Sequence, residues 1–236
     1  LWQWGAYRFA KQLHGAQKFD LVHHITFVSI RHFSFMGRLS IPFVLGPIGG
    51  GETSPFWLRW HTGWRGGWRD TWRDVLNALS RLDPVVQGAF RKADVIVATT
   101  DETLRLVPGK YRSKARAVLQ IGIDRADGTV KVAKATERCK RLLFVGRFIH
   151  WKGMTLGLQA LARAVAHDPA LTLTFVGKGP AEAHWRLLAQ RLGIAGRITW
   201  IPWLPQAELQ QLYASHGVFL FPSLHDSGGQ VVLEAL

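Results

Sequence analysis

This sequence contains a single cysteine, Cys139, among its 236 residues. One thiol cannot form a disulfide within the chain, and it leaves a zinc site without the paired cysteines that structural zinc sites use. A secreted domain held together by disulfides is therefore excluded. We expect the protein to be cytoplasmic, with peripheral contact on the inner face of the membrane as an open alternative.

Long apolar runs are also lacking. No stretch reaches the ~18 consecutive apolar residues of a membrane-spanning helix, which excludes a transmembrane protein. The first residues, LWQWGAYRFAKQLHG, have no basic region followed by an apolar core and a cleavage site. They are therefore not expected to act as a signal peptide.

Acidic residues are scarce, because 16 Asp and Glu stand against 30 Lys and Arg, for a formal charge of +14. Of the basic residues, 20 are arginine, whose planar fork matches the oxygens of phosphate. Such a charge predicts an anionic partner: a nucleic acid, a membrane surface or a phosphorylated small molecule. Charge alone does not choose among these three.

The remaining composition is globular, with 47% hydrophobic and 19% charged residues, which excludes intrinsic disorder. Apolar strand-like runs alternate with amphipathic helical segments on both sides of a polar, basic stretch at 124–138. This alternation predicts an α/β protein with two doubly wound parallel-sheet domains of Rossmann-like type. The expected boundaries are 1–123 for the first domain, 124–138 for a linker and 139–236 for the second domain.

The expected elements follow from this periodicity. Ser54 and Pro55 are expected to cap a helix, with Pro55 at its first position. The expected strands are 19–28, 41–46, 93–100, 115–121, 141–146, 171–177, 197–201 and 217–222, and the expected helices include 1–18, 84–92, 101–107, 154–166, 181–193 and 206–214.

The motif VGRFIHWKG (145–153) places Arg147 directly after a predicted strand and Lys152 at the start of a predicted helix. Doubly wound sheets bind ligands at the carboxyl ends of their strands. Two cations beside a helix N-terminus suit a diphosphate. The alternative is that both are ordinary surface charges.

The segment FPSLHDSGGQVVLEAL (221–236) carries Asp226 and Glu234, with an SGGQ sequence between them. Carboxylates accept hydrogen bonds from sugar hydroxyls, and paired glycines allow a ligand to approach the backbone closely. The alternative is an aspartate near a helix cap and a glutamate on a solvated helix face.

These two segments, together with LTFVGKGP and ITWIPWLPQAELQQLYA, resemble in this order the second domain of family 4 (group 1) glycosyltransferases. Those are retaining enzymes of the GT-B fold. ARAVLQIGID resembles the stretch that closes their first domain, and FDLVHHITFVSIRHF and FVLGPIGGGE resemble the first domain of a bacterial subset of the family. The resemblance also implies an internal fragment, with the first domain incomplete at its N-terminus and the second at its C-terminus.

The resemblance implies roles for individual residues. Arg147 and Lys152 would bind the diphosphate of the donor, Glu234 its ribose and Asp226 its sugar, although the family has a longer glutamate at the position of Asp226. Together these four form the expected catalytic set. The remaining donor-binding residues would be Gly146, Gly177, Gly179, Trp203, Ser227, Gly228, Gly229 and Gln230.

The function implied is retaining transfer of a hexose from a nucleotide-diphosphate sugar to a saccharide or lipid-linked acceptor, in polysaccharide or glycolipid biosynthesis. No cofactor or metal is expected, because two cations and backbone amides can stabilise the charge of the leaving diphosphate. The alternative is a non-catalytic module that binds a nucleotide sugar or a membrane surface. Nucleic acid is not an expected partner.

The glycine loop GPIGGGET matches the spacing of a phosphate-binding P-loop from Gly46 to Gly51, but Glu52 stands where that motif needs lysine. A P-loop NTPase is therefore not expected. The resemblance places this loop at the acceptor side, through Gly49, Gly50 and Gly51. His23 and His24 are further acceptor-side candidates, with a structural role as the alternative.

The segment 56–74 spaces Trp57, Trp60, Trp64, Trp68 and Trp72 three or four residues apart, with arginines between them. On a helix this pattern forms one stripe, although Gly63, Gly66 and Gly67 weaken a continuous helix. The stripe is interpreted as packing on the first domain's sheet, with a membrane interface as the next alternative. Stacking of single-stranded nucleic acid on tryptophan is the third.

Overall fold

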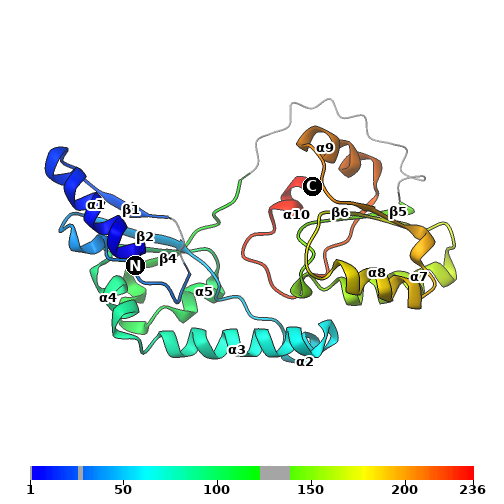
Figure 1. Cartoon of the computed structure of the whole chain (residues 1–236), viewed down its shortest axis with the longest axis horizontal. Helices are drawn as coiled ribbons and strands as arrows, with labels where there is room; N and C mark the ends of the chain where they lie inside the picture. Colours follow the sequence, from blue (N-terminus) through cyan, green and yellow to red (C-terminus); the bar gives the residue numbers. More distant parts are fainter. Residues whose placement is uncertain (1, 26–28, 123–138) are drawn as a thin grey trace. The chain divides into compact units, whose positions relative to one another are not determined.

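A computed structural model describes residues 2–25, 29–122 and 139–236. The expected linker at 124–138 lies outside the described residues. The chain divides into two compact units (Figure 1). The first comprises residues 1–53 and 69–120, and the second comprises 54–68 and 121–236.

The first unit is built on a parallel sheet with the strand order β1-β2-β3-β4. Its strands are β1 (Val22–His24), β2 (Phe43–Ile48), β3 (Val95–Ala98) and β4 (Ala115–Ala117). Every pairing between neighbours is parallel, with His23 of β1 opposite Val44 of β2. The other elements of this unit are α1 (Trp2–Ala16), η1 (Met36–Arg38), α4 (Pro84–Lys92), α5 (Asp101–Leu106) and η3 (Gly109–Lys114).

One face of this sheet carries the core of the first unit. Alternate residues of the strands point to opposite faces, so Phe43, Leu45 and Ile96 enter one buried cluster together with side chains of α4. The residues between them are less covered, and Val95 is 42% exposed. The α4 helix begins where expected, because the Asp83 side chain accepts hydrogen bonds from the amides that follow.

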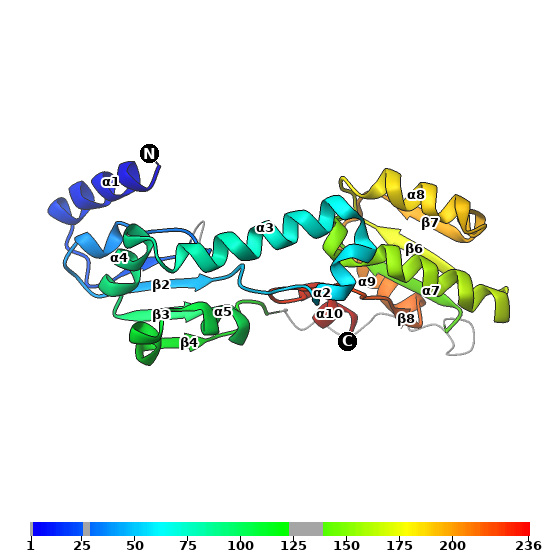
Figure 2. The ribbon, with the colours of Figure 1, turned by 90° about the horizontal axis from the view of Figure 1, so that it is seen from below.

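The tryptophan-rich segment forms α2 (Phe56–Arg59), η2 (Trp60–Thr62) and α3 (Trp64–Ser80), and Figure 2 shows α3 as one long helix. Gly63, with φ 106°, separates η2 from α3, because this backbone conformation is readily open only to glycine. The expected cap at Ser54 and Pro55 is wrong. Pro55 is itself the N-cap of α2, and the Ser54 hydroxyl contacts His225 instead.

The interpretation that the tryptophan stripe packs on the first sheet is also wrong. The tryptophan side chains of this segment face solvent. Trp57, Trp64, Trp68 and Trp72 are each more than 60% exposed, and Trp60 is 37% exposed.

The second unit holds a parallel sheet with the order β7-β6-β5-β8. Its strands are β5 (Arg141–Val145), β6 (Thr172–Val176), β7 (Ile198–Ile201) and β8 (Val218–Phe219). The chain starts in the middle of the sheet, adds β6 and β7 on one side, and returns to add β8 on the other. The change of direction at β5 and β8 is the place where doubly wound sheets bind ligands.

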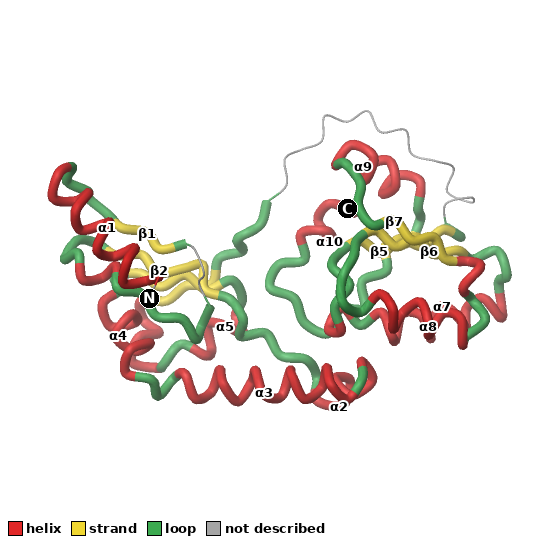
Figure 3. Tube along the Cα trace, viewed as in Figure 1, coloured by secondary structure: helices red, strands yellow, loops and turns green. Residues whose placement is uncertain are grey.

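Helices cover both faces of this second sheet (Figures 1 and 3). On one face α7 (Met154–His167) and α8 (Glu182–Arg191) enclose a core that includes Phe144. On the other face α9 (Gln206–Ser215) and α10 (Gln230–Ala235) pack near Leu143 and Val145. Consecutive residues of β5 thus enter opposite cores, which confirms the doubly wound prediction for this unit.

His216, which ends α9, ties that helix to β6. Its Nδ1 donates to the Leu212 carbonyl at 2.8 Å, so its Nε2 accepts from the Thr174 hydroxyl at 2.9 Å. Burial lowers the pKa of His216, and the nearby Arg141 lowers it further, while the bond to Leu212 opposes the shift.

This arrangement predicts a loss of stability in acid. The unfolded chain binds a proton at His216 at its ordinary pKa, and the folded chain does so only at lower pH. The free energy of unfolding should therefore fall as pH drops below about 6.5. His216→Asn should flatten that part of the profile in urea unfolding, whereas His184→Asn, at an exposed site of α8, should leave it unchanged. Equal slopes in the wild type and His216→Asn would contradict the prediction.

Candidate nucleotide-sugar site

The predicted cations lie at the carboxyl end of β5. Arg147 lies two residues after the end of β5 and is exposed. Lys152 ends a short 3₁₀ turn, η4 (His150–Lys152), immediately before α7. Its side chain is only 13% exposed. The ammonium group of Lys152 is therefore held beside the positive end of a helix, where anions bind favourably.

Lys152 forms an ion pair with Asp226, a contact that the sequence did not predict. The ammonium group contacts Asp226 Oδ2, while Oδ1 accepts from the Ser227 amide at 3.0 Å. The Lys152 ammonium also lies 4.9 Å from the ring centroid of Phe221. Sequence reasoning did not single out Phe221, which supplies a cation–π contact on the same loop.

Gly153 explains how the Asp226 loop reaches Lys152. It has φ +69°, and a Cβ built there would lie 2.0 Å from the Pro222 carbonyl oxygen. A side chain at this position would push residues 222–226 away from the start of α7. Gly153 was missed as a functional residue, although the KG pair of the sequence motif contains it.

The loop carrying Asp226 is held by a further contact that the sequence did not suggest. The His225 ring stacks on Trp151 with centroids 5.4 Å apart. His225 Nδ1 also lies 2.8 Å from the Ser54 hydroxyl, and Arg59 Nη2 donates to the Ser54 carbonyl at 2.7 Å. These partners are far apart in sequence, so periodicity carries no signal for them.

Glu234 does not join the Lys152–Asp226 pair among the contacts of the described residues. Its Oε2 accepts from the Tyr213 hydroxyl at 3.1 Å, and its Oε1 accepts from Gln230 Nε2 at 3.1 Å. Burial, and then the Glu234 carboxylate, raise the pKa of Tyr213, so the phenol remains protonated and can donate. Both oxygens of Glu234 are thereby fixed in orientation.

The glycines expected to line the donor are required by the packing of the strand ends themselves. Gly177 has φ +135°, and a Cβ there would lie 2.0 Å from the Gly146 carbonyl oxygen. A Cβ on Gly179 would lie 2.4 Å from the Phe148 carbonyl oxygen. Trp203, on the loop after β7, is 71% exposed. Geometry alone thus explains Gly177 and Gly179 as parts of the rim.

The glycines near the last helix have separate structural reasons. Gly229 is the N-cap of α10 and has φ +64°. A Cβ on Gly228 would lie 3.2 Å from the Ile121 side chain. Together with Ser227 and Gln230 they form the connection between Asp226 and Glu234.

The acceptor-side histidines both make contacts within the first unit. His23 is exposed, and its Nε2 donates to the Gly46 carbonyl at 2.8 Å, which links β1 to β2. His24 is buried, at 7% exposure, with its Nε2 3.4 Å from Gln3 Nε2. The contacts of His23 and His24 therefore support the structural alternative for this pair.

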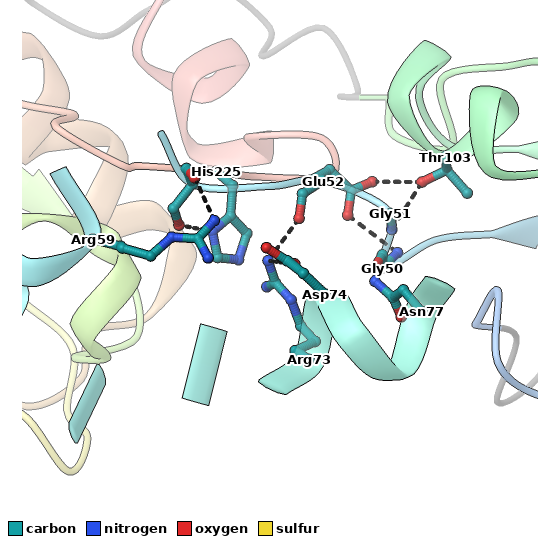
Figure 4. A network of polar contacts seen from close by, with 10 residues as sticks. Gly50, Gly51, Glu52, Arg59, Arg73, Asp74, Asn77, Thr103 and His225 are labelled. Atoms are coloured by element: carbon teal, nitrogen blue, oxygen red, sulfur yellow. Dashed lines mark hydrogen bonds and ion pairs between the residues drawn. The ribbon is translucent and has the colours of Figure 1, made fainter. Parts of the chain in front are cut away.

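Glu52 is the centre of a polar network that holds the glycine loop (Figure 4). The residue is 5% exposed. Its Oε2 accepts from the Gly50 amide at 3.1 Å, and its Oε1 accepts from three hydroxyls at the start of α5. Those hydroxyls belong to Thr99, Thr100 and Thr103, at 3.3, 3.0 and 3.0 Å.

The residues Asn77 and Arg73 of α3 hold the same loop through its carbonyl groups. Asn77 Nδ2 donates to the Gly50 carbonyl at 2.8 Å, and Arg73 Nη2 donates to the Glu52 carbonyl at 2.7 Å. The Gly51 amide donates to Thr103 Oγ1 at 3.1 Å. The amides of Gly50 and Gly51 are thus committed to the protein, which argues against a phosphate cradle of P-loop type.

Within residues 2–25, 29–122 and 139–236, no group of three or more His, Cys, Asp or Glu side chains is placed to hold a metal ion. None of the helices in those ranges is long and apolar enough to cross a bilayer.

Comparison with solved structures defines the class of fold. The lipopolysaccharide outer core galactosyltransferase WaaB, in its apo form, matches with a TM-score of 0.61 at 14% identity, over 97% of this chain and 57% of that one. Anabaena Alr3699/HepE in complex with UDP and glucose matches with a TM-score of 0.56 at 14% identity, over 96% and 59%. The chain therefore has the GT-B glycosyltransferase fold, as predicted.

Sequence comparison finds a family that the second half of the chain matches. Residues 129–236 match the family model of glycosyl transferases group 1. The D-inositol 3-phosphate glycosyltransferase of Corynebacterium urealyticum is 32% identical over 162 residues, which is 61% of this chain and 38% of that protein. The second half of the chain is therefore similar to group 1 glycosyltransferases, in agreement with the resemblance seen in the sequence. The chain spans under half the length of this curated relative.

The close approach at Gly153 predicts a large effect of adding one methyl group. Gly153→Ala should lower the free energy of unfolding by more than the ~1–2 kcal/mol that a left-handed backbone alone costs alanine, because the methyl group also meets the Pro222 carbonyl. Gly193→Ala is the matched control, since Gly193 has φ +70° with nothing within 4 Å. Urea unfolding of both variants measures the difference, and equal losses would show that the Pro222 contact does not matter.

The Glu52 network makes a second stability prediction. Glu52→Ala should destabilise the chain by on the order of 3 kcal/mol, because several buried donors lose their acceptor at once. Glu102→Ala, at an exposed site of α5, should cost under about 1 kcal/mol. Chemical unfolding of the two variants is the measurement, and a loss at Glu52 no larger than at Glu102 would contradict the role given to the network.

Proposed function

We propose that this chain forms the core of a retaining glycosyltransferase, which moves a hexose from a nucleotide-diphosphate sugar to a saccharide or lipid-linked acceptor. The proposed setting is polysaccharide or glycolipid biosynthesis at the cytoplasmic side of a membrane. The observation that carries this proposal is the Lys152–Asp226 pair at the carboxyl end of β5, beside the N-terminus of α7.

The comparisons support this proposal by analogy. The names of the matching proteins include a D-inositol 3-phosphate glycosyltransferase and a lipopolysaccharide galactosyltransferase, and one matching structure contains UDP and glucose. These names and bound molecules belong to those proteins. For the present chain they suggest a uridine nucleotide as the first donor to test.

The proposed chemistry uses the chain's own cations. As the sugar bond breaks, the diphosphate gains negative charge, and Arg147 and Lys152 would stabilise it in a site that is already organised. An ammonium group has three donors, so Lys152 can retain Asp226 while it binds a phosphate oxygen. We propose that this mechanism needs no metal ion.

The two carboxylates have different proposed tasks. Asp226, fixed by Lys152 and Ser227, would accept hydrogen bonds from sugar hydroxyls, and Glu234, fixed by Tyr213 and Gln230, would accept them from the ribose. A diphosphate leaves without protonation, so Asp226 and Glu234 are not proposed as an acid/base pair.

The proposal predicts that UDP stabilises the folded chain through Lys152. In a thermal-shift titration with UDP, UDP-sugars, GDP-sugars and ADP-sugars, at least one nucleotide should raise the melting temperature, because a ligand that binds the native state stabilises it. Lys152→Met should weaken that nucleotide's binding roughly tenfold or more through loss of a charge-assisted contact.

Lys140→Met is the matched control for this titration. Lys140 lies at the opposite end of β5, paired with Asp168 at 3.2 Å, and its loss should leave nucleotide binding unchanged. The donor-site assignment is overturned if no nucleotide shifts the melting temperature, or if both lysine variants weaken binding equally.

A further inference from the structure

The α3 helix turns a polar side toward the protein and an apolar side toward solvent, which is the reverse of an ordinary surface helix. Its buried side chains are polar, with Asp70 and Asn77 each only 2% exposed. Most of its apolar side chains face solvent, although Leu76 is half-buried. The exposed apolar residues form what we call the tryptophan stripe: Trp64, Trp68, Trp72, Val75 and Leu79, with exposures of 67%, 61%, 63%, 41% and 55%.

Helical geometry alone places the tryptophan stripe along one side of α3. Its members are spaced four, four, three and four residues apart, which is the spacing of side chains on one helical face. At 1.5 Å per residue the stripe is about 22 Å long. An exposed apolar surface of this length marks an interaction site in a water-soluble domain.

Aromatic contacts extend the stripe beyond the helix. The Trp60 ring lies 5.9 Å from the Trp68 ring, and the Phe56 ring lies 6.3 Å from Trp60, both edge to face. A Cβ on Gly67 would lie 2.6 Å from the Trp60 ring, so the glycine makes room for it. The rings of Phe56, Trp60 and Trp68 therefore pack against one another as one aromatic cluster.

The charges beside the stripe have one sign. Arg65 and Arg69 are exposed, each next to a stripe tryptophan, and the Arg65 guanidinium lies 5.4 Å from the Trp64 ring centroid. In the stretch 54–80, all of which lies in a described range, no acidic side chain is exposed. Asp70 is buried, and the half-buried Asp74 pairs with Arg73 at 3.3 Å.

We propose that the tryptophan stripe docks the protein on an anionic lipid bilayer, with α3 lying in the plane of the headgroups. Tryptophan is favoured at this boundary, because its ring is apolar and its N–H is polar. Arginines at the same depth meet anionic headgroups, which attract them. The docking proposal rests on the proposed function, because it takes the acceptor of the transferase to be lipid-linked or otherwise held at a membrane.

Two other occupants fit the stripe less well. A second copy of the chain, docked through the same surface, would set arginine against arginine, because a two-fold interface brings like patches together. Single-stranded nucleic acid would use the tryptophan rings and arginines, but Val75 and Leu79 offer bases nothing to stack on. A bilayer uses the rings, the aliphatic end and the positive charges alike.

The test is flotation of the chain with vesicles of phosphatidylcholine, alone or with a third of phosphatidylglycerol, at low and high salt. The wild type should bind the anionic vesicles at low salt, and more weakly at high salt or without the anionic lipid. Replacing Trp64, Trp68 and Trp72 together by alanine should reduce partitioning roughly tenfold or more. Arg65→Ala with Arg69→Ala should weaken binding to anionic vesicles only.

Trp203→Ala is the matched control, since Trp203 is 71% exposed on a loop outside the stripe. It should bind vesicles like the wild type. Quenching of wild-type tryptophan fluorescence by brominated acyl chains gives a second measurement that needs no variant. The UDP titration is run on every variant, so that loss of donor binding and loss of lipid binding are scored separately.

Several outcomes overturn the proposal. The first is that the triple variant binds vesicles as well as the wild type does. The second is that Trp203→Ala loses as much vesicle binding as the triple variant. The third is that the wild type shows neither flotation nor quenching. If the wild type self-associates in light scattering but does not bind vesicles, and the triple variant does not self-associate, the stripe binds a second copy of the chain. Oligonucleotide binding without vesicle binding assigns it to nucleic acid.

Discussion

One ion pair, between Lys152 and Asp226, is the interaction on which the candidate donor site depends. It joins residues 74 positions apart, and it brings the loop that follows β8 to the turn that follows β5. Both side chains are largely withdrawn from water, so their attraction is screened less than that of a surface pair. The contacts around the pair, from Ser227, Phe221 and the stacked His225, keep the two loops together.

The second constraint is the close approach of one backbone segment to another at the carboxyl ends of the strands. This approach gives a structural reason for the glycines there. The family resemblance implies that Gly146, Gly177 and Gly179 bind the donor. In the structure the close neighbour of Gly177 and Gly179 is the chain itself, because the carbonyls of Gly146 and Phe148 occupy the space where their side chains would stand. The glycines therefore shape the rim of the site. Whether a donor also touches them stays a prediction.

Much of the fold could be predicted because its signals are local. The periodicity of an apolar strand or an amphipathic helix is contained in a short stretch of sequence. The observed bounds of α4, β5, α7, β6 and α9 accordingly lie within a residue or two of their expected ranges. The GT-B fold and the similarity to group 1 glycosyltransferases could be recognised for the same reason, from contiguous motifs. The errors concern the segment from Ser54 to Trp72. There Pro55 caps α2, Gly63 separates η2 from α3, and periodicity indicates a stripe without saying which way it faces.

By itself the sequence determined the order and type of the elements, the excess of arginine, and the cations and carboxylates at strand ends, because each depends on residues close together in the chain. Only the tertiary structure decided that Lys152 meets Asp226, that Tyr213 and Gln230 orient Glu234, and that α3 turns its tryptophans outward. Those outcomes depend on which distant segments pack together. The amphipathic pattern of a helix is the same whether its apolar side meets a core or solvent.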